Sequence, residues 1–146
     1  MQLNDAGNEL RRVQLPEYME PWHAVESPSA TFIVSRHENT ELNDQWQVSE
    51  VNTEGQVLRQ FSGSRLSPLN RTDHIAIDSQ GNIFVADYYN GRILLLDAQL
   101  ALRRVIIDEH QLIYNRPYRL CYKEQSGQLT VGLNKGGVAV FDVLKR

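Results

Sequence analysis

A run of alternating apolar and polar residues at positions 75–97 constrains the fold of this chain more than any other feature. Apolar side chains recur at every second position, which is the pattern of β-strands with a buried face. Residues 79–82 (Ser-Gln-Gly-Asn) and 88–91 (Tyr-Tyr-Asn-Gly) interrupt the alternation, as turns do. The run therefore predicts three short strands in up-and-down order.

The same pattern occurs again on both sides of this run, at a spacing of about 45 to 50 residues. The matching segments are residues 23–25, 31–34 and 47–52 upstream, and residues 120–122, 129–131 and 138–142 downstream. In the upstream copy the second turn is predicted to be longer, from about residue 36 to residue 46. The second turns of both outer copies are predicted to be looser than the turn at residues 88–91.

A fourth segment with a shared Leu-Arg core follows the third strand. It occurs at residues 57–61 and 101–105, and again at residues 9–13 near the start of the chain. Units of four strands at this period are the blades of β-propellers. The chain is therefore predicted to be all-β, a β-propeller fragment of about three four-stranded blades.

The repeats predict one partial propeller over residues 1–146. Its parts are an orphan fourth strand of a preceding blade at 1–15, blades at 19–63 and 69–108, and a three-strand final blade at 115–146. Blades bury their faces only against neighbours, and three blades do not close a normal ring. We expect the missing blades to come from a longer chain or from homodimerisation.

The middle unit resembles a known repeat. Residues 81–87 (Gly-Asn-Ile-Phe-Val-Ala-Asp) followed by residues 90–93 (Asn-Gly-Arg-Ile) are similar to the NHL repeat, the blade of six-bladed propellers. The outer units match in spacing only: Ser35 and Leu133 are assigned to the place of Asp87, and Gly137 to that of Arg92. The resemblance implies NHL-like blades such as those of tripartite-motif proteins, which select substrates for ubiquitin ligation or bind single-stranded RNA.

In such a repeat Asp87 and Arg92 flank a tight turn. The carboxylate at the end of one strand can accept a charge-assisted hydrogen bond from the guanidinium at the start of the next. We interpret the two residues as a structural turn pair.

Propeller loops between second and third strands emerge on the same face as the connections between blades. This face is predicted to gather arginine, asparagine and tyrosine side chains, which pair with phosphate, stack on unpaired bases and are also enriched in protein hot spots. The candidate binding residues are Arg36, His37, Arg71, Tyr88, Tyr89, Asn90, Arg116, Tyr118 and Lys135.

The sequence offers no evident catalytic or metal centre. The histidines are scattered, and a zinc site from His23 and His74 is conceivable in neighbouring blades but has no accompanying cysteine or carboxylate pattern. The single cysteine, Cys121, is interpreted as a small core residue. We predict no enzyme, no metal and no cofactor; a lactonase-like propeller enzyme is the least favoured alternative.

The composition favours a cytoplasmic protein without a membrane segment, since no apolar run is long enough to span a bilayer. A formal net charge of −3 argues against a surface that binds nucleic acid throughout. The prediction is a non-catalytic recognition or scaffold module of NHL type that binds a protein partner, like the substrate-binding part of a ubiquitin-ligase-like protein. Binding of single-stranded RNA through the loop face is the alternative.

Overall fold

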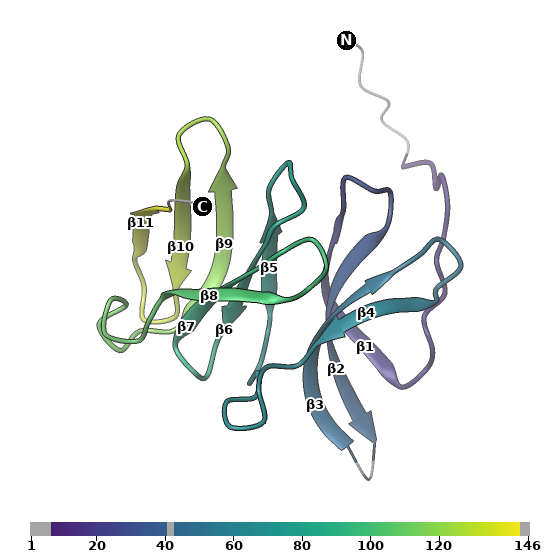
Figure 1. Ribbon diagram of the computed structural model, residues 1–146, viewed down its shortest axis with the longest axis horizontal. Coiled ribbons are helices and arrows are strands. Elements are labelled where there is room, and N and C mark those ends of the chain that lie inside the picture. The colour runs from purple at the N-terminus through teal and green to yellow at the C-terminus, as the bar shows by residue number, and fades with distance from the viewer. Residues whose placement is uncertain (1–6, 41–42, 144–146) are drawn as a thin grey trace.

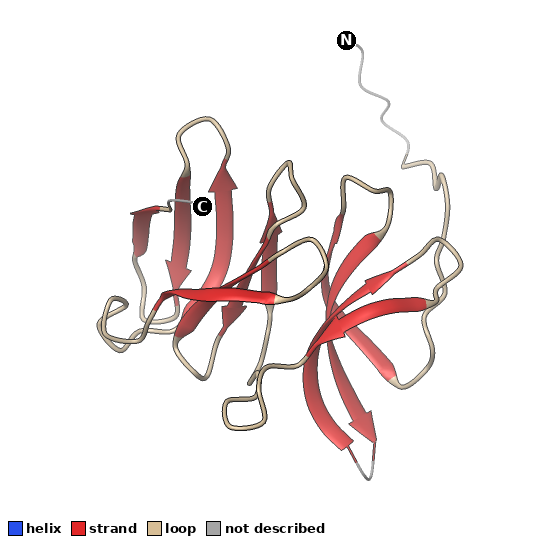
Figure 2. Ribbon diagram, in the orientation of Figure 1, coloured by secondary structure: helices blue, strands red, loops and turns tan. Residues whose placement is uncertain are grey.

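The computed structural model describes residues 7–40 and 43–143 and is all-β. Its strands form three antiparallel sheets in which each strand pairs with its neighbour in sequence. Figures 1 and 2 show the sheets following one another across the molecule, each with the meander of a propeller blade. The predicted fold class is confirmed.

The first sheet has the order β1-β2-β3-β4. Its strands are β1 (Met19–Glu26), β2 (Phe32–Thr40), β3 (Asn43–Val51) and β4 (Val57–Phe61). The second sheet has the order β5-β6-β7-β8. Its strands are β5 (His74–Ile77), β6 (Ile83–Asp87), β7 (Arg92–Leu96) and β8 (Leu102–Ile107). We call these sheets the first and the middle blade.

The third sheet, here called the last blade, has three strands in the order β11-β10-β9. They are β9 (Pro117–Lys123), β10 (Gln128–Leu133) and β11 (Val138–Asp142). The first strands of the three blades are neighbours, because β5 contacts both β1 and β9. The strands that begin each blade therefore form the inner layer from which the blades fan out.

Two apolar layers hold the blades together, and β6 contributes to both. Ile83 and Val85 pack toward the first blade, whereas Phe84 and Ala86 pack toward the last blade. All four side chains are fully buried. Burial of an Ile, Val or Phe side chain contributes roughly 1.5–3 kcal/mol. The period-two pattern of the middle blade thus stabilises both blade interfaces.

The long turn predicted at residues 36–46 is wrong. The β2–β3 ladder continues through His37↔Trp46 and Glu38↔Gln45 to Thr40↔Asn43. The connection that remains, residues 41–42, lies outside the described residues. Polar side chains such as these are compatible with an extended hairpin, because backbone pairing does not require a buried face on both sides.

The segment predicted as an orphan fourth strand forms no strand within its described part, residues 7–15. It has no third strand beside it to pair with and instead lies along the outer face of the first blade. The Arg11 guanidinium is 5.9 Å from the centroid of the Phe32 ring. Val13 and Leu15 line the same groove as Phe32 and Val34. Residues 1–6 are outside the described residues.

The last blade presents its outer face to solvent. Leu120 of β9 packs into the apolar layer toward the middle blade, but Cys121 is exposed on the other face. The interpretation of Cys121 as a core residue is therefore not confirmed, because among residues 7–40 and 43–143 no sheet covers this face. No helix in the described ranges has the length and apolar character needed to cross a membrane.

Candidate functional site

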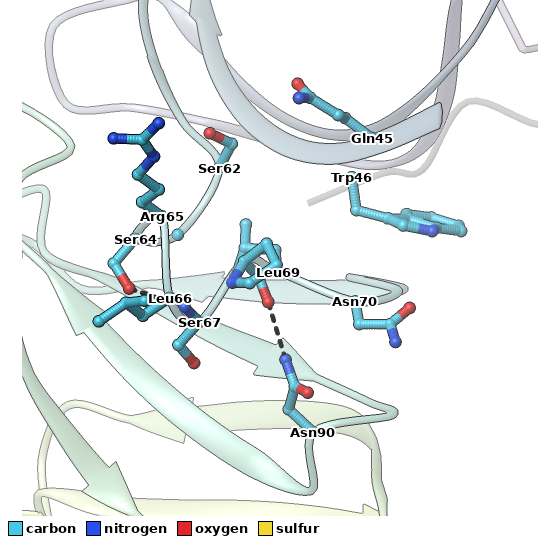
Figure 3. A pocket seen from close by; sticks show the side chains of 12 residues that line it. Gln45, Trp46, Ser62, Ser64, Arg65, Leu66, Ser67, Leu69, Asn70 and Asn90 are labelled. Carbon is cyan, nitrogen blue, oxygen red and sulfur yellow. Dashed lines mark hydrogen bonds between the residues drawn. The ribbon is translucent and has the colours of Figure 1, made fainter. Parts of the chain in front are cut away.

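The turn between β6 and β7, residues 88–91, is organised by one buried carboxylate. Asp87 is fully buried, and its oxygens accept hydrogen bonds from the Asn70 backbone N–H at 2.8 Å, Asn90 Nδ2 at 2.8 Å and Arg92 Nε at 2.7 Å. Asn90 Nδ2 also donates to the Pro68 carbonyl oxygen at 2.9 Å (Figure 3). Asp87 therefore connects a strand end, a turn and the connector that precedes β5.

The contacts of Arg92 extend this arrangement. Its guanidinium donates to the Ser67 carbonyl oxygen at 3.2 Å as well as to Asp87. Burial raises the pKa of Asp87, while the three donors and the charge of Arg92 oppose that rise. The pair joins neighbouring strands in the β6–β7 ladder, where Asp87 lies opposite Arg92.

Backbone hydrogen bonds fix the tyrosines of the same turn to the connector. The Tyr88 N–H donates to the Arg71 carbonyl at 2.9 Å, and the Tyr89 N–H donates to the Asn70 carbonyl at 3.1 Å. Arg71 itself has a φ of 67°, in the left-handed region that few non-glycine residues adopt. The local backbone is therefore held in a specific shape that carries Arg71, Tyr88 and Tyr89 to one place.

Five of the sequence-predicted residues meet here, and we call them the Arg–Tyr cluster: Arg71, Tyr88, Tyr89, Arg116 and Tyr118. The Arg71 guanidinium carbon is 4.8 Å from the Tyr88 ring centroid and 5.5 Å from that of Tyr89. The Arg116 guanidinium carbon is 5.8 Å from Tyr88 and 4.9 Å from Tyr89. The Tyr88 ring also packs edge-on against Tyr89 at 5.1 Å and Tyr118 at 6.0 Å.

The two arginines of the cluster differ in their partners. Arg71 Nε donates to both oxygens of the buried Asp73 carboxylate at 2.9 Å, and its NH1 donates to the Tyr89 hydroxyl at 3.2 Å. The Asp73 bond, with that of Tyr89, raises the pKa of Arg71 above its ordinary value. Arg116 has no carboxylate within 4.0 Å of its guanidinium among the described residues. Its charge is therefore available to a ligand.

The last blade positions Arg116 through its backbone. The Arg116 N–H donates to Asn134 Oδ1 at 2.7 Å, and the Asn134 N–H donates to the Arg116 carbonyl at 3.1 Å. Nearby, Arg119 lies with its guanidinium carbon 4.0 Å from the Tyr118 ring centroid. The loop face predicted from the sequence also contains Asn134, whereas Arg119 was not among the candidate binding residues; its position directly after Tyr118 in β9 was the available signal.

Two hollows lie on either side of the 88–91 turn. One, of about 650 Å³, lies between the start of β3 and the 62–70 connector and is shown in Figure 3. The other, of about 220 Å³, is lined by Tyr89, Glu109, Tyr114 and Arg116 among others. Asn90 lines both. An extended ligand that crosses the turn would therefore contact the Arg–Tyr cluster at its centre.

Arg36 and His37 do not join this cluster, and their prediction as loop residues is wrong. Both lie in β2, and the side chain of Arg36 is only 3% exposed. Arg36 donates to Ser49 Oγ at 2.8 Å, to Gln60 Oε1 at 3.1 Å and to Gln47 Oε1. His37 stacks on Trp46 at 4.6 Å. Lys135 is exposed in the turn after β10, next to Asn134.

The ladder also corrects the assignment of Ser35 to the place of Asp87. His23 pairs with Ser35 and His74 pairs with Ala86, so Ser35 corresponds to Ala86 and the next residue, Arg36, corresponds to Asp87. The first blade thus places a cation where the middle blade places a carboxylate.

Comparison with known proteins identifies the fold. No protein-family model matches the chain, and no curated protein matches it. A protein of unknown function from Bacteroides caccae has a TM-score of 0.54 at 18% identity, over 89% of this chain and 44% of that one. A streptogramin B lyase has a TM-score of 0.55 at 12% identity, over 86% of this chain and 41% of that one. The chain thus spans less than half the length of these structures.

The second similarity corrects one expectation. The prediction that the chain is not an enzyme is contradicted, because a structure that shares this fold is named as a lyase. At 12% identity the likeness carries the propeller fold and not the activity. Within residues 7–40 and 43–143, no group of three or more His, Cys, Asp or Glu side chains is arranged to hold a metal ion.

Proposed function

We propose that this chain binds an acidic segment of a protein partner through the Arg–Tyr cluster. The observation that carries the proposal is the position of Arg116, which lies over the Tyr89 ring without a carboxylate partner among the described residues. A guanidinium held on an aromatic ring is oriented in advance and can donate two parallel hydrogen bonds to a carboxylate. A glutamate or aspartate of a partner is the matching group.

The packing of the tyrosines favours a protein over single-stranded RNA. Base stacking on an aromatic side chain requires an open ring face. Arg71 and Arg116 lie near the rings of both Tyr88 and Tyr89, so part of the ring surface that a base would use is already in contact with a guanidinium. Tyr89 and Tyr118 nevertheless remain 45% and 39% exposed. Their accessible edges and hydroxyls are suited to the mixed apolar and polar contacts of a protein interface.

The residue types also support this proposal energetically. Tyrosine and arginine are enriched among interface residues whose truncation weakens binding most. Hydrogen bonds to Asp73 and Asn134 hold the two arginine-bearing segments in place. Less conformational freedom is then lost when a ligand binds. The NHL-like sequence of the middle blade agrees with a recognition module of that type.

The proposal can be tested by selecting peptides from a displayed random library on the immobilised chain. We expect enrichment of sequences that combine Asp or Glu with an apolar residue. Arg116→Ala should weaken the binding of a selected peptide by about 2 kcal/mol, roughly thirtyfold. Arg103→Ala is the matched control, because Arg103 is an exposed arginine on β8 away from the cluster.

Three results would count against the proposal. They are an absence of enrichment, enrichment of peptides without acidic residues, and equal effects of Arg116→Ala and Arg103→Ala. A labelled oligouridine provides the RNA comparison. Tighter binding of oligouridine than of any selected peptide, lost in Tyr89→Ala, would favour the RNA alternative.

A second candidate function is catalysis of the kind named for the structural neighbour, favoured by two adjacent histidines on the inner strands. The ring centroids of His23 and His74 are 3.9 Å apart. Incubation of the chain with streptogramin B, followed by mass spectrometry, tests this candidate. Conversion that is lost in His74→Asn would support it, and unchanged substrate would remove it.

A further inference from the structure

Three blades present donor side chains at one equivalent position of their first strands. His23 of β1, His74 of β5 and Arg119 of β9 each lie opposite a small residue of the next strand. Those small residues are Ser35, Ala86 and Gly132 respectively. The first strands are neighbours in space, and first strands line the centre of a propeller. The three side chains therefore belong to one inner ring of positions.

Hydrogen bonds between the blades determine where the imidazole protons lie. The Ile75 backbone N–H donates to His23 Nδ1 at 3.4 Å, and the Leu120 backbone N–H donates to His74 Nδ1 at 3.0 Å. A neutral imidazole that accepts a hydrogen bond at Nδ1 carries its proton at Nε2. Neither Nε2 has a hydrogen-bond partner among the described residues. Each ring thus offers one free N–H donor.

Both rings are neutral at physiological pH. Burial, followed by the charges of His23 and Arg119, lowers the pKa of His74 to about 4, although Asp73 acts in the opposite direction. Burial and then the charge of Arg119 lower the pKa of His23. The effect of Arg119 on both rings agrees with its place on β9, the inner strand next to β5.

This protonation pattern argues against a metal and in favour of an anion. A metal would need the Nε2 lone pair, and supplying it would move the ring proton to Nδ1, against a backbone N–H. This move of the proton would break the hydrogen bond from the backbone N–H to Nδ1 that joins two blades. An oxyanion instead needs donors, and two Nε2–H groups with a guanidinium supply donors only. The zinc site considered between His23 and His74 is therefore unfavourable.

We propose that His23, His74 and Arg119 form an oxyanion-binding site, for a carboxylate or a phosphate group, at the inner strands. The site goes beyond the partner surface proposed above, because its three donors are not members of the Arg–Tyr cluster; the two share only the Tyr118 ring. The Tyr118 ring beneath Arg119 at 4.0 Å holds the guanidinium in place. A larger ligand could also present such a group here.

The experiment is a histidine-selective ¹H–¹⁵N NMR titration of the full chain with sodium acetate and, separately, sodium phosphate. Ionic strength is held constant with sodium chloride near neutral pH. We expect saturable shifts at Nε2 of His23 and His74. His110, an exposed histidine outside the ring, is the internal control and should not shift. Saturation by acetate identifies a carboxylate site, and saturation by phosphate alone identifies a phosphate site.

Two variants sharpen the test. Arg119→Gln should weaken the anion affinity about tenfold, because a charge-assisted donor is lost from an exposed side chain. His74→Asn keeps an acceptor for the Leu120 N–H but removes the Nε2 donor, so it should weaken binding without loss of structure. The site would be refuted by shifts that are absent, unsaturable, equal at His110 or unchanged in Arg119→Gln.

Discussion

The first and middle blades use opposite charges at the same place. Asp87 ends β6, and Arg36 occupies the corresponding position of β2. A carboxylate only accepts hydrogen bonds, and Asp87 collects those of Asn70, Asn90 and Arg92. A guanidinium only donates, and Arg36 finds its acceptors on Ser49, Gln47 and Gln60 of β3 and β4.

The hairpins that follow this position differ in length. In the middle blade the Asp87 carboxylate accepts hydrogen bonds from the Asn90 side chain of the turn and from the Asn70 N–H of the connector. The short 88–91 turn carries Tyr88 and Tyr89 of the Arg–Tyr cluster. In the first blade the β2–β3 ladder continues past Arg36 to Thr40↔Asn43. Asp87 thus fixes the turn that carries part of the candidate site.

The largest expected effect is that of removing this carboxylate. Asp87→Ala leaves the Arg92 guanidinium, the Asn70 N–H and the Asn90 amide without their acceptor in a buried place. We expect the free energy of unfolding to fall by about 3–4 kcal/mol, measured by chemical denaturation. Asp87→Asn keeps the shape and one acceptor, and should lose less. A loss below about 1 kcal/mol in Asp87→Ala would contradict the role given to Asp87.

The matching change in the first blade should cost less. Arg36→Met removes a buried cation whose NH1 has no hydrogen-bond partner. Apolar replacement of a buried charge recovers its desolvation cost, while the three acceptors lose a donor. We expect a loss of about 2 kcal/mol by the same denaturation experiment. A loss as large as that of Asp87→Ala would show that the two blades depend equally on this position.

The inner histidines, His23 and His74, can be compared through the pH dependence of the free energy of unfolding. The folded-state pKa of His74 is about 4, below its ordinary value of 6.5, so the unfolded chain binds the proton first. Stability from this group is complete above pH 6.5 and falls as the pH drops toward 4. Because the ring is partly exposed, we expect a loss of about 1 kcal/mol rather than the roughly 3 kcal/mol of a fully buried ring.

Chemical denaturation of wild type, His74→Asn and His23→Asn across this pH range separates the contributions of the two histidines to the pH dependence of stability. The His74→Asn variant should lose most of this pH dependence, and His23→Asn less of it, since the bond from Ile75 to His23 is the longer one. Equal curves for wild type and His74→Asn would be incompatible with a neutral His74 in the folded chain.

The smallest effect concerns the turn itself. Asn90→Ala removes two donors at a partly exposed position, to Asp87 and to the Pro68 carbonyl. We expect a stability loss of about 0.5 kcal/mol. The turn should also become more accessible to hydrogen exchange at Tyr88 and Tyr89. Unchanged exchange at these two amides would mean that Asp87 and Arg92 alone hold the turn.

Sequence alone predicted much of the fold, because period-two alternation and turn residues are local signals. The middle blade was predicted closely for this reason. The extent of the β2–β3 hairpin was not predicted, since residues 36–46 carry few apolar side chains. The equivalence of Arg36 and Asp87 was also missed. Spacing alone placed Ser35 at this position, whereas the ladder places Arg36, a residue of opposite charge to Asp87, there.

The grouping of the candidate residues could be predicted in part, and their role in binding stays a prediction. Loop position brought Arg71, Tyr88, Tyr89, Arg116 and Tyr118 into one set, and in the structure these five residues lie together. The pairing of His23 and His74 with backbone N–H groups of the following blade could not be predicted. Those bonds depend on the offset between neighbouring sheets, which no local pattern encodes.

The most direct test of the central claim is the affinity of an acidic peptide selected on this chain, measured by fluorescence anisotropy at fixed ionic strength. Wild type, Arg116→Ala and Arg103→Ala would be compared. The account predicts roughly thirtyfold weaker binding for Arg116→Ala and unchanged binding for Arg103→Ala. Equal affinities for all three proteins would contradict recognition through the Arg–Tyr cluster.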